Sequence, residues 1–561
     1  SVHIMSEFAD TYSEERGAEA VIRDVVGHLF RPMLFTSLTS SVGFLSLMLT
    51  PIPPVQIFGA FVAFGILLAF AVTIVFIPAY VVRMKPESLA GLAQRGGGDK
   101  DADTPLARGL RHLGRFAFSR SGLIAVVAFV VAVISALGVM RIEINDNPVR
   151  WFKADHRIRV ADAVLNEHFA GTYDAFLVLS YTGDSGLSAF RSGAETLLNE
   201  AAAASAEVAD LNELLAAAAP GAALDRLISA TDDALFEAPD AAIEPLETLL
   251  AEAEQVQSAS RYFQNPAALD YITGLQQALL DTGRVGKTNA LPDVVKVVNR
   301  ELRGGTEDNY TLPESPAGVA QTLLQYQSSH RPQDLWHMVT PDLRKTAIWL
   351  QLTSGDNQHM SAVIDAMDAY IAANPPPAGV EARWAGKTYI NVVWQQAMVQ
   401  GMLKSLLGAF VVVFAMMSFL FRSLKFGLIA MLPLSITILG VYGLIGWIGK
   451  DYDMPIAVLS SLTLGLSVDF AIHFIERMRS LYDQTGSFAE AGRQLFEEPG
   501  RAISRNAIVI ALGFTPLFLA PLVPYITVGA FMASIMAISG LATLLLLPAV
   551  MSLFRPAMPA D

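Results

Sequence analysis

The segment MPIAVLSSLTLGLSVDFAIHFIE (residues 454–476) decides the fold class, because it is almost entirely apolar and long enough to cross a bilayer. A hydrocarbon core about 30 Å thick needs roughly 20 apolar residues in an α-helix. Backbone groups have no water partners in lipid, so each such segment is predicted to be helical. Further segments of the same character are 32–50, 54–82, 120–140, 401–421, 425–448, 502–522 and 525–553. The chain is therefore predicted to be a polytopic α-helical membrane protein.

Net charge divides the chain into two chemically different parts. Only 16% of the residues are charged, whereas soluble proteins carry about 25%. Residues 141–398 hold 34 acidic and 18 basic residues, and the whole chain has a net charge of −14. A large acidic, water-exposed domain is thus predicted inside a hydrophobic chain. This charge excludes nucleic acid as a partner, and the absence of cysteine excludes disulfides and thiol catalysis.

Basic residues in the connecting segments predict the orientation in the membrane. They concentrate in the connector 83–119, in the turn after residue 421 and in the segment after residue 476. Since short cytoplasmic loops are enriched in Lys and Arg, these three regions are predicted to be cytoplasmic. Residues 141–398 then lie on the opposite side, which is the periplasm if the membrane is a bacterial inner membrane. Residues 91–104 are predicted to be a flexible linker.

The acidic domain is predicted to mix strands and helices. β-branched and aromatic residues indicate strands at Asp174–Ser180, Thr346–Thr353 and Val380–Ala385. Helices are predicted at 157–170, 186–218, 221–259 and 360–373. The Ala-, Glu- and Leu-rich stretch 194–256 is predicted to be an inserted helical hairpin, broken at Pro220 or Pro239.

An internal repeat relates the two ends of the chain. Residues 3–86 align with residues 473–556 at a constant offset of 470 and without a gap. The matched positions include His3 with His473, Arg31 with Arg501, Gly43 with Gly513, Pro51 with Pro521 and Pro78 with Pro548. A shared apolar composition does not explain matched histidine, arginine, glycine and proline positions. The repeat predicts two related halves in parallel orientation, as in transporters built from such repeats.

The repeat also predicts how the domains are arranged. Each intact half is expected to have six spans, with an outer domain between its first and second spans. Ser1 corresponds to Ala471, so the chain is expected to begin within a span and to lack the N-terminal part of a longer protein. The predicted domains are the end of the first half (1–86, with part of span 4 and spans 5 and 6), a cytoplasmic linker (87–119), span 7 (120–140), the outer domain (141–398) and spans 8–12 (399–556).

A carboxylate within the segment 454–476 is the strongest functional candidate. Asp469 lies well inside the apolar run, where a charged side chain costs about 2.5–3.5 kcal/mol on insertion scales. Burial favours the protonated form, so this group can exchange a proton near neutral pH. His473 lies one helical turn further on the same face, and imidazole titrates in the useful range. Asp469 and His473 are predicted to form a proton relay; the structural alternatives are an interhelical hydrogen bond and simple packing.

Hydroxyl and amide groups are candidate partners of this relay, because they can hydrogen-bond a buried carboxylate across helices. Thr36 and Thr39 belong to the hydroxyl-rich run 36–41, and the corresponding run in the second repeat begins at Asn506. Ser467 and Thr463 flank Asp469 in sequence, which leaves Na⁺ open as the coupling ion instead of H⁺. Small hydroxylated residues also permit close helix packing, which is the structural alternative for each of them.

Two motifs resemble nucleotide-binding loops but lack a glycine that such loops require. Gly-Lys-Thr occurs at 286–288 and at 386–388, but a nucleotide-binding loop needs a further glycine five residues earlier. Asp281 and Glu381 occupy those positions. His, Asp and Glu residues do not occur with metal-ligand spacing either. No catalytic residue, metal ion or cofactor is therefore predicted.

The chain resembles the resistance-nodulation-division (RND) superfamily, and within it the mycobacterial-membrane-protein-large (MMPL) type and the hopanoid- and sterol-transporter branches. The motifs that carry the resemblance are Gly465-x-x-x-Asp469-Phe470-x-x-His473, the Gly-Phe and Pro-x-x-Pro patterns of both repeats, and Asp146-Asn147-Pro148-x-x-Trp151-Phe152. The resemblance implies porter-like, ferredoxin-like α/β outer domains and acidic relay residues in the fourth and tenth spans. Asp469 matches the tenth-span position, and the fourth-span position would precede Ser1. Phe470 stands where many relatives have tyrosine, so a tyrosine hydroxyl is missing here.

The resemblance implies proton-driven export of lipid-like hydrophobic molecules, such as a sterol or hopanoid, from the bacterial inner membrane towards the periplasm or outer membrane. Alternative functions are a lipid-sensing membrane protein that does not transport and a protein-export accessory of the same superfamily. The expected partners are the hydrophobic cargo and the membrane. A homo-oligomer and a periplasmic or outer-membrane partner are left open, as are the identity of the cargo and the coupling ion.

Overall fold

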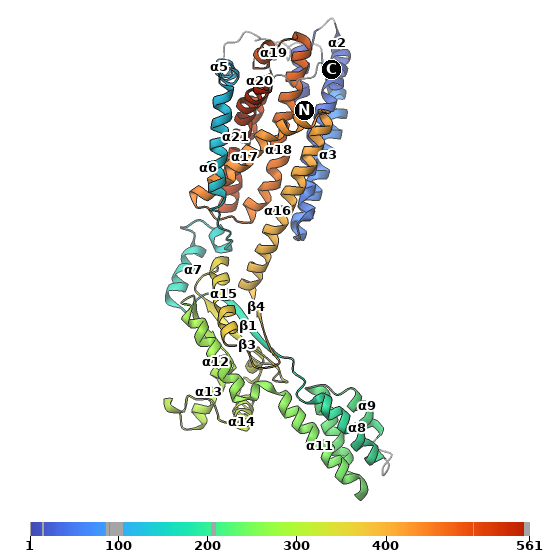
Figure 1. Ribbon diagram of the computed structural model, residues 1–561, viewed down its shortest axis with the longest axis vertical. Coiled ribbons are helices and arrows are strands. Elements are labelled where there is room, and N and C mark those ends of the chain that lie inside the picture. The colour runs from blue at the N-terminus through green and yellow to red at the C-terminus, as the bar shows by residue number, and fades with distance from the viewer. Residues whose placement is uncertain are drawn as a thin grey trace. The chain divides into compact units, whose positions relative to one another are not determined.

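The computed structural model describes residues 2–13, 16–85, 89, 105–202, 209–496 and 499–554. The chain forms two compact units, Ser1–His156 with Trp394–Asp561, and Arg157–Val393. We call the first the membrane unit and the second the sheet unit, after their main elements (Figure 1). The predicted linker at 91–104 lies outside the described residues.

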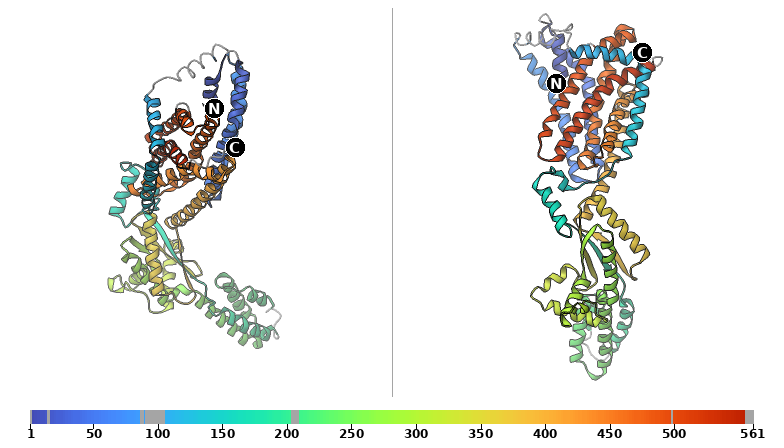
Figure 2. Two further views of the ribbon diagram at one scale, coloured as in Figure 1. Left: turned by 45° about the horizontal axis from the view of Figure 1, so that its top comes forward. Right: turned by 90° about the vertical axis from the view of Figure 1, so that its left-hand side faces the viewer.

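The membrane unit is a bundle of long apolar helices (Figures 1 and 2). Among the described residues, eight helices are long and apolar enough to cross a membrane. The helices of this unit are α1 Val2–Thr11, α2 Gly17–Leu45, α3 Pro53–Val82, α5 Pro105–Ser119, α6 Ser121–Val139, α16 Lys387–Leu420 (which begins in the sheet unit), α17 Leu424–Ile448, α18 Met454–Thr485, α19 Phe488–Leu495, α20 Pro499–Phe514 and α21 Val523–Leu553. The prediction of a polytopic helical membrane protein is confirmed.

Helix α18 is the most enclosed of these candidate spans. In α18, 79% of the most apolar window is buried, whereas the same value for α3 is 6%. Helix α18 packs against α2, α17 and α21, while α3 exposes large apolar side chains such as Phe61 and Phe64. Most of the apolar part of α18 is therefore surrounded by protein, and the exposed surface of α3 suits contact with lipid.

The internal repeat is visible in the backbone. Helix α2 ends in the 3₁₀ turn Ser46–Leu49 before α3, and α20 ends in the 3₁₀ turn Thr515–Leu519 before α21. A Cβ atom on Gly59 of α3 would lie 2.4 Å from the carbonyl oxygen of Phe44, and one on Gly529 of α21 would lie 3.0 Å from that of Phe514. Both pairs differ by the offset of 470, so the two copies share the close helix contact that glycine permits.

The sheet unit has a four-stranded antiparallel sheet in the order β2-β3-β1-β4. Its strands are β1 Tyr173–Tyr181, β2 Val285–Asn289, β3 Lys345–Leu352 and β4 Val380–Ala385. Helix α12 (Pro266–Asp281) leads from β1 to β2, and α15 (Asn357–Ala373) leads from β3 to β4. This is the split βαβ, ferredoxin-like topology. The buried residues of both helices and of the sheet, such as Leu177, Ile348, Leu275 and Met360, form one core.

Three of these strands were predicted from the sequence, and β2 was not. Its five residues include Gly286, Lys287 and Asn289, which are poor strand formers. A Cβ atom on Gly286 would lie 1.9 Å from the carbonyl oxygen of Ala170, so glycine is needed for this close approach. The first Gly-Lys-Thr motif therefore lies in an edge strand and does not form a phosphate-binding loop before a helix.

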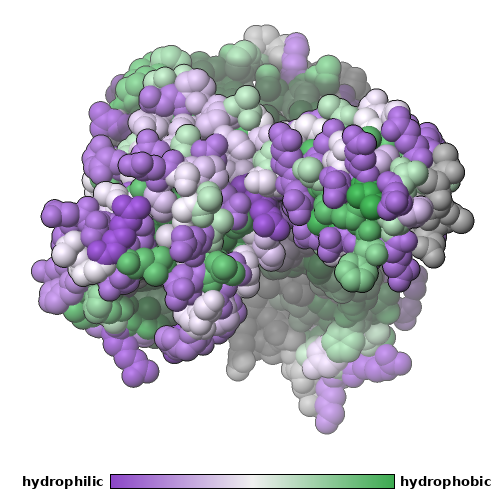
Figure 3. All heavy atoms as spheres, turned by 90° about the horizontal axis from the view of Figure 1, so that it is seen from below, coloured by the Kyte–Doolittle hydropathy of each residue, from purple (hydrophilic) through white to green (hydrophobic). Residues whose placement is uncertain are grey.

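A helical insertion lies between β1 and α12. It contains α8 Leu187–Ala202, α9 Ala209–Ala216, α10 Ala222–Phe236 and α11 Asp240–Ser260, which enclose an apolar core of their own. The predicted hairpin is wrong in one respect, because helices are interrupted near Pro220 and also near Pro239. Residues 194–256 hold 14 acidic residues and one arginine, and the face of the molecule seen in Figure 3 is mostly hydrophilic.

The remaining helices of the sheet unit are α7 Arg157–His168, α13 Leu291–Leu302 and α14 Pro316–Gln327. Helix α7 has no buried residue among its twelve, whereas α13 and α14 contribute Val295 and Leu323 to the core of the sheet unit. Because α13 and α14 lie between β2 and β3, these strands are not joined by the short hairpin of the simplest ferredoxin-like fold.

Candidate functional site

Helices α2 and α18 approach each other closely at a serine and a glycine. The hydroxyl of Ser40 donates a hydrogen bond to the carbonyl oxygen of Gly465 over 3.0 Å. A Cβ atom on Gly465 would lie only 2.9 Å from the Cα atom of Ser40, so a larger residue would separate the helices. The two helices run antiparallel here, because Thr36 faces Asp469 one turn away from this contact.

Asp469 has a carboxyl oxygen that is enclosed and unpaired. Its Oδ1 atom is inaccessible to solvent and has no hydrogen-bond partner among the described residues, and the same holds for Oγ1 of Thr36. Thr36 is near enough to interact with the carboxyl group, but the two groups do not reach hydrogen-bond geometry. Because most buried polar atoms in proteins are hydrogen-bonded, such an orphan is a candidate functional group.

Further titratable residues follow Asp469 on the same face of α18. His473 is half-buried one turn on, and Glu476 follows after almost another turn. Glu476 lies close to the side chains of Arg31 and His28 on α2. A line of ionisable groups therefore leads from Asp469 to the cytoplasmic end predicted for α18. The side chain of His3, which corresponds to His473 in the repeat, lies outside the described groups.

The other predicted partners lie elsewhere or are engaged. The hydroxyl of Thr39 donates to the carbonyl oxygen of Thr36, and that of Thr463 donates to the carbonyl oxygen of Leu459. Ser467 lies two residues before Asp469, which places it about 200° around the helix. Asn506 is half-buried on α20. Within the described part of the chain, Thr36 alone of these five approaches the Asp469 carboxyl, and the role of each residue stays a prediction.

Helix α21 adds buried hydroxyls that sequence reasoning missed. Ser539 donates to the carbonyl oxygen of Ser467 over 3.4 Å. The Oγ1 atom of Thr543, one turn further along α21, is buried and unpaired among the described residues, as is the Oγ atom of Ser467. The available signal was the spacing of four between Ser539 and Thr543 in a mainly apolar span. The face of α18 opposite Asp469 is therefore polar as well.

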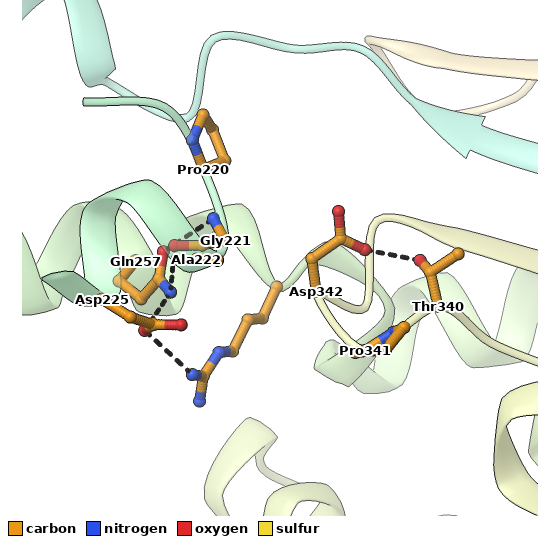
Figure 4. A pocket seen from close by; sticks show the side chains of 9 residues that line it. Pro220, Gly221, Ala222, Asp225, Gln257, Thr340, Pro341 and Asp342 are labelled. Carbon is orange, nitrogen blue, oxygen red and sulfur yellow. Dashed lines mark hydrogen bonds and ion pairs between the residues drawn. The ribbon is translucent and has the colours of Figure 1, made fainter. Parts of the chain in front are cut away.

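A separate pocket lies in the sheet unit, between the helical insertion and the turn before β3 (Figure 4). Its volume is about 360 Å³. Asp225 pairs with Arg261 at 3.6 Å and accepts a hydrogen bond from Gln257, and Asp342 accepts one from Thr340. Its charged groups thus satisfy one another or face polar neighbours, so this pocket does not suit an apolar cargo. No group of three metal-ligating side chains occurs in the described part of the chain.

The fold is that of a polytopic helical membrane protein with a sheet unit of split βαβ topology. Comparison with known proteins shows what the chain is similar to. The model of the MMPL family matches residues 311–560, in agreement with the resemblance noted in the sequence. RND and MMPL proteins are transporters rather than enzymes.

Known proteins that are similar to the chain include a membrane protein of an archaeon and a release protein of an animal. The "Putative membrane protein MJ1562" of Methanocaldococcus jannaschii is 25% identical over 195 residues, which cover 35% of this chain and 50% of that protein. The cryo-EM structure of the hedgehog release protein Disp from the water bear Hypsibius dujardini matches with a TM-score of 0.56 and 15% identity, over 98% of this chain and 61% of that chain. At this identity the match shows the fold alone. The chain spans about half the length of its curated relative.

Proposed function

We propose that the chain belongs to a proton-driven exporter of lipid-like hydrophobic molecules. The observation that carries this proposal is Asp469, which is half-buried between α18 and α2 and whose Oδ1 atom is inaccessible to solvent and unpaired among the described residues. A carboxyl in such surroundings changes its interactions strongly when it gains or loses a proton, because the charged form is poorly solvated. Protonation would therefore alter how the two repeats pack.

The repeat supports a mechanism of alternating packing. Helix α2 belongs to the first copy of the repeat. Helix α18 leads into the second copy, which begins at His473, so we assign α18 to the second half. The contact of Asp469 with α2 then lies between the two related halves. Interhelical contacts at this site involve backbone carbonyls and small residues, which leave little room for partial movements. Two discrete arrangements of the halves, selected by the protonation state, would alternate during transport. Na⁺ in place of H⁺ is the alternative coupling ion.

The nature of the cargo rests on resemblance. MMPL-like proteins and the sterol and hopanoid branches handle lipids, and the structural neighbour Disp is described as a release protein for hedgehog. The exposed apolar side chains of α3 and α6 would let hydrophobic cargo reach the bundle from the bilayer. From the resemblance we propose a bacterial inner membrane, and from the distribution of basic residues we propose that the sheet unit lies on its periplasmic side.

The test is Asp469→Asn in the full-length protein, reconstituted into liposomes that hold a fluorescent sterol analogue and a pH gradient. We expect the variant to lose gradient-dependent movement of the sterol, because its side chain cannot exchange a proton. Asp483→Asn is the matched control, since Asp483 is an exposed acid on the same helix. Unchanged proton-dependent movement in Asp469→Asn removes this residue from the mechanism, and movement driven by a Na⁺ gradient instead changes the coupling ion.

Two further outcomes would point to the alternative functions. Sterol binding without movement across the membrane would favour a lipid sensor. Co-purification of the full-length protein with a secretion channel would favour a protein-export accessory. A mass-spectrometric inventory of the lipids bound to the purified protein would identify the cargo class independently of any transport assay.

A further inference from the structure

The segment that leads from α6 to the sheet unit is docked onto the membrane unit. We call residues 143–152 the strap. The backbone N–H of Tyr452 donates to the carbonyl oxygen of Glu143 over 2.7 Å, and the N–H of Asn145 donates to the carbonyl oxygen of Tyr452 over 3.4 Å. Tyr452 lies in the loop between α17 and α18, so the strap forms a short parallel bridge with that loop.

Side chains reinforce this backbone bridge. The amide of Asn145 donates to Oδ2 of Asp451 over 3.1 Å, and the guanidinium group of Arg150 lies 3.3 Å from the same oxygen. The indole N–H of Trp151 donates to Oδ1 of Asp146 over 2.9 Å. Asn145 and Asp146 are each only 4% exposed, so most of this network is withdrawn from water and depends on its internal partners.

The strap also reaches the first residues of α18. Asp453 caps this helix by accepting the backbone N–H of Ile456 over 3.2 Å, and it pairs with Lys450 at 2.8 Å. The carboxyl of Asp146 accepts the backbone N–H of Met454, the first residue of α18. An acid from the strap therefore satisfies a free N–H at the end of the helix where the macrodipole favours negative charge.

A third contact ties the strap to the second repeat. Phe152 forms an antiparallel bridge with Leu522, the residue before α21. The strap thus holds the starting points of α18, which carries Asp469, and of α21, which packs against α18. Only four residues separate the strap from Arg157, where the sheet unit begins.

We propose that the strap is the joint through which a displacement of α18 is passed to the sheet unit, with Asp146 and Trp151 as its positioning residues. This inference rests on the proposed function, since it assumes that α18 moves when Asp469 changes its protonation state. The strap stays docked through the cycle, because undocking would expose a buried acid and the starting N–H of α18 without partners. If the strap were a flexible connector instead, a displacement of α18 would not move the sheet unit.

Docking is tested first, without any transport assay. The chain contains no cysteine, so Asn145→Cys with Asp451→Cys introduces a single pair. We expect this pair to form a disulfide under mild oxidation in native membranes, in the full-length protein. The pair Asp155→Cys with Asp451→Cys is the control, because Asp155 is an exposed residue beyond the strap. If both pairs cross-link to the same extent, or if neither pair cross-links, the strap is not docked.

Coupling is tested next with the fluorescent sterol assay and a simultaneous measurement of proton flux. We expect Asp146→Ala and Trp151→Ala to lose sterol movement while proton flux through the protein persists. Asp146→Asn keeps one acceptor oxygen, which can still accept the indole N–H of Trp151, so we expect it to retain movement, and Asp155→Ala should behave as the unmodified protein. The disulfide-locked pair should also retain movement, because the joint remains closed.

These outcomes separate the joint from a purely structural clamp and from the proposed function. Loss of sterol movement and proton flux together, with poor folding, in both Asp146→Ala and Asp146→Asn would mean that the strap only stabilises the bundle. A locked pair that blocks movement would overturn the permanent docking. If Asp469→Asn transports normally while the strap variants lose movement, the proton mechanism fails and the joint survives.

Discussion

The contact between α2 and α18 yields the sharpest quantitative prediction. The perturbation is Gly465→Ala, which adds one methyl group where the helices touch. The new carbon atom would lie 2.9 Å from Cα of Ser40 and 3.2 Å from its carbonyl oxygen. Both neighbours are backbone atoms, which cannot rotate away as a side chain can. Since comfortable carbon contacts are about 3.5–4.0 Å, α2 and α18 must separate by roughly half an ångström or more.

The magnitude follows from three opposing effects. Overpacking of this kind costs about 1–3 kcal/mol. Weakening the hydrogen bond from Ser40 to Gly465 costs about a further 1 kcal/mol, while alanine gains about 1 kcal/mol over glycine in an exposed helix. The net destabilisation is therefore about 1–3 kcal/mol. Because Thr36 and Asp469 face each other one turn away, the same separation should also impair the proposed transport.

The assay is thermal unfolding of the purified full-length protein in detergent, followed by tryptophan fluorescence. The matched control is Gly440→Ala on α17, because a Cβ atom there would meet nothing within 4 Å. We expect an apparent Tm for Gly465→Ala below that of the control, which should equal or exceed the original protein. Equal transition temperatures for the two variants would refute the close contact and, with it, the placement of Thr36 beside Asp469.

Two other predictions concern the strap and the helical insertion. Burial raises the pKa of Asp146 above its ordinary value of 3.8; the hydrogen bond from Trp151 opposes this rise, and nearby Asp453 adds to it. The folded state therefore binds the proton more tightly than the unfolded state does. Stability is lost as the pH rises from about 4 through the raised pKa. Asp146→Asn should remove this loss, so its apparent Tm should fall less than that of the original protein between pH 4 and 7, and identical pH profiles would contradict the assignment. Leu246→Ala should destabilise the insertion by about 2–5 kcal/mol, because Leu246 is 1% exposed in the insertion's own core; proteolysis of this segment would then accelerate, whereas the exposed substitution Glu247→Ala should leave it unchanged.

Hydrophobic segments were predictable because lipid imposes a simple rule on the chain. Every backbone group in the bilayer must be satisfied within a helix, so length and apolar composition are sufficient to locate a span. The repeat was equally accessible, since matched Gly and Pro positions mark the same helix contacts in both copies. Strand β2 was missed because its pairing with β3 outweighs the poor strand propensity of Gly286 and Lys287.

The candidate site was only partly accessible from the sequence. Asp469 stands out because a carboxylate in an apolar helix requires a reason. Thr463 and Ser467 seemed suitable partners because they are near in sequence, but the 100° rotation per residue turns Ser467 away from the face of α18 that carries Asp469. Thr36, more than 400 positions away, is the group that approaches it.

The amino-acid sequence by itself determined the membrane-spanning class and the two-copy organisation. It also identified Asp469 as an acid that is costly to expose to lipid. These properties follow from local composition, because each segment partitions into the bilayer according to its own length and apolar content. Only the tertiary structure decided that Ser40 touches Gly465, that Thr36 faces Asp469 and that the strap accepts the first N–H of α18. Such pairings depend on the register between distant helices, and that register is set by close packing of small residues rather than by any local preference of the chain.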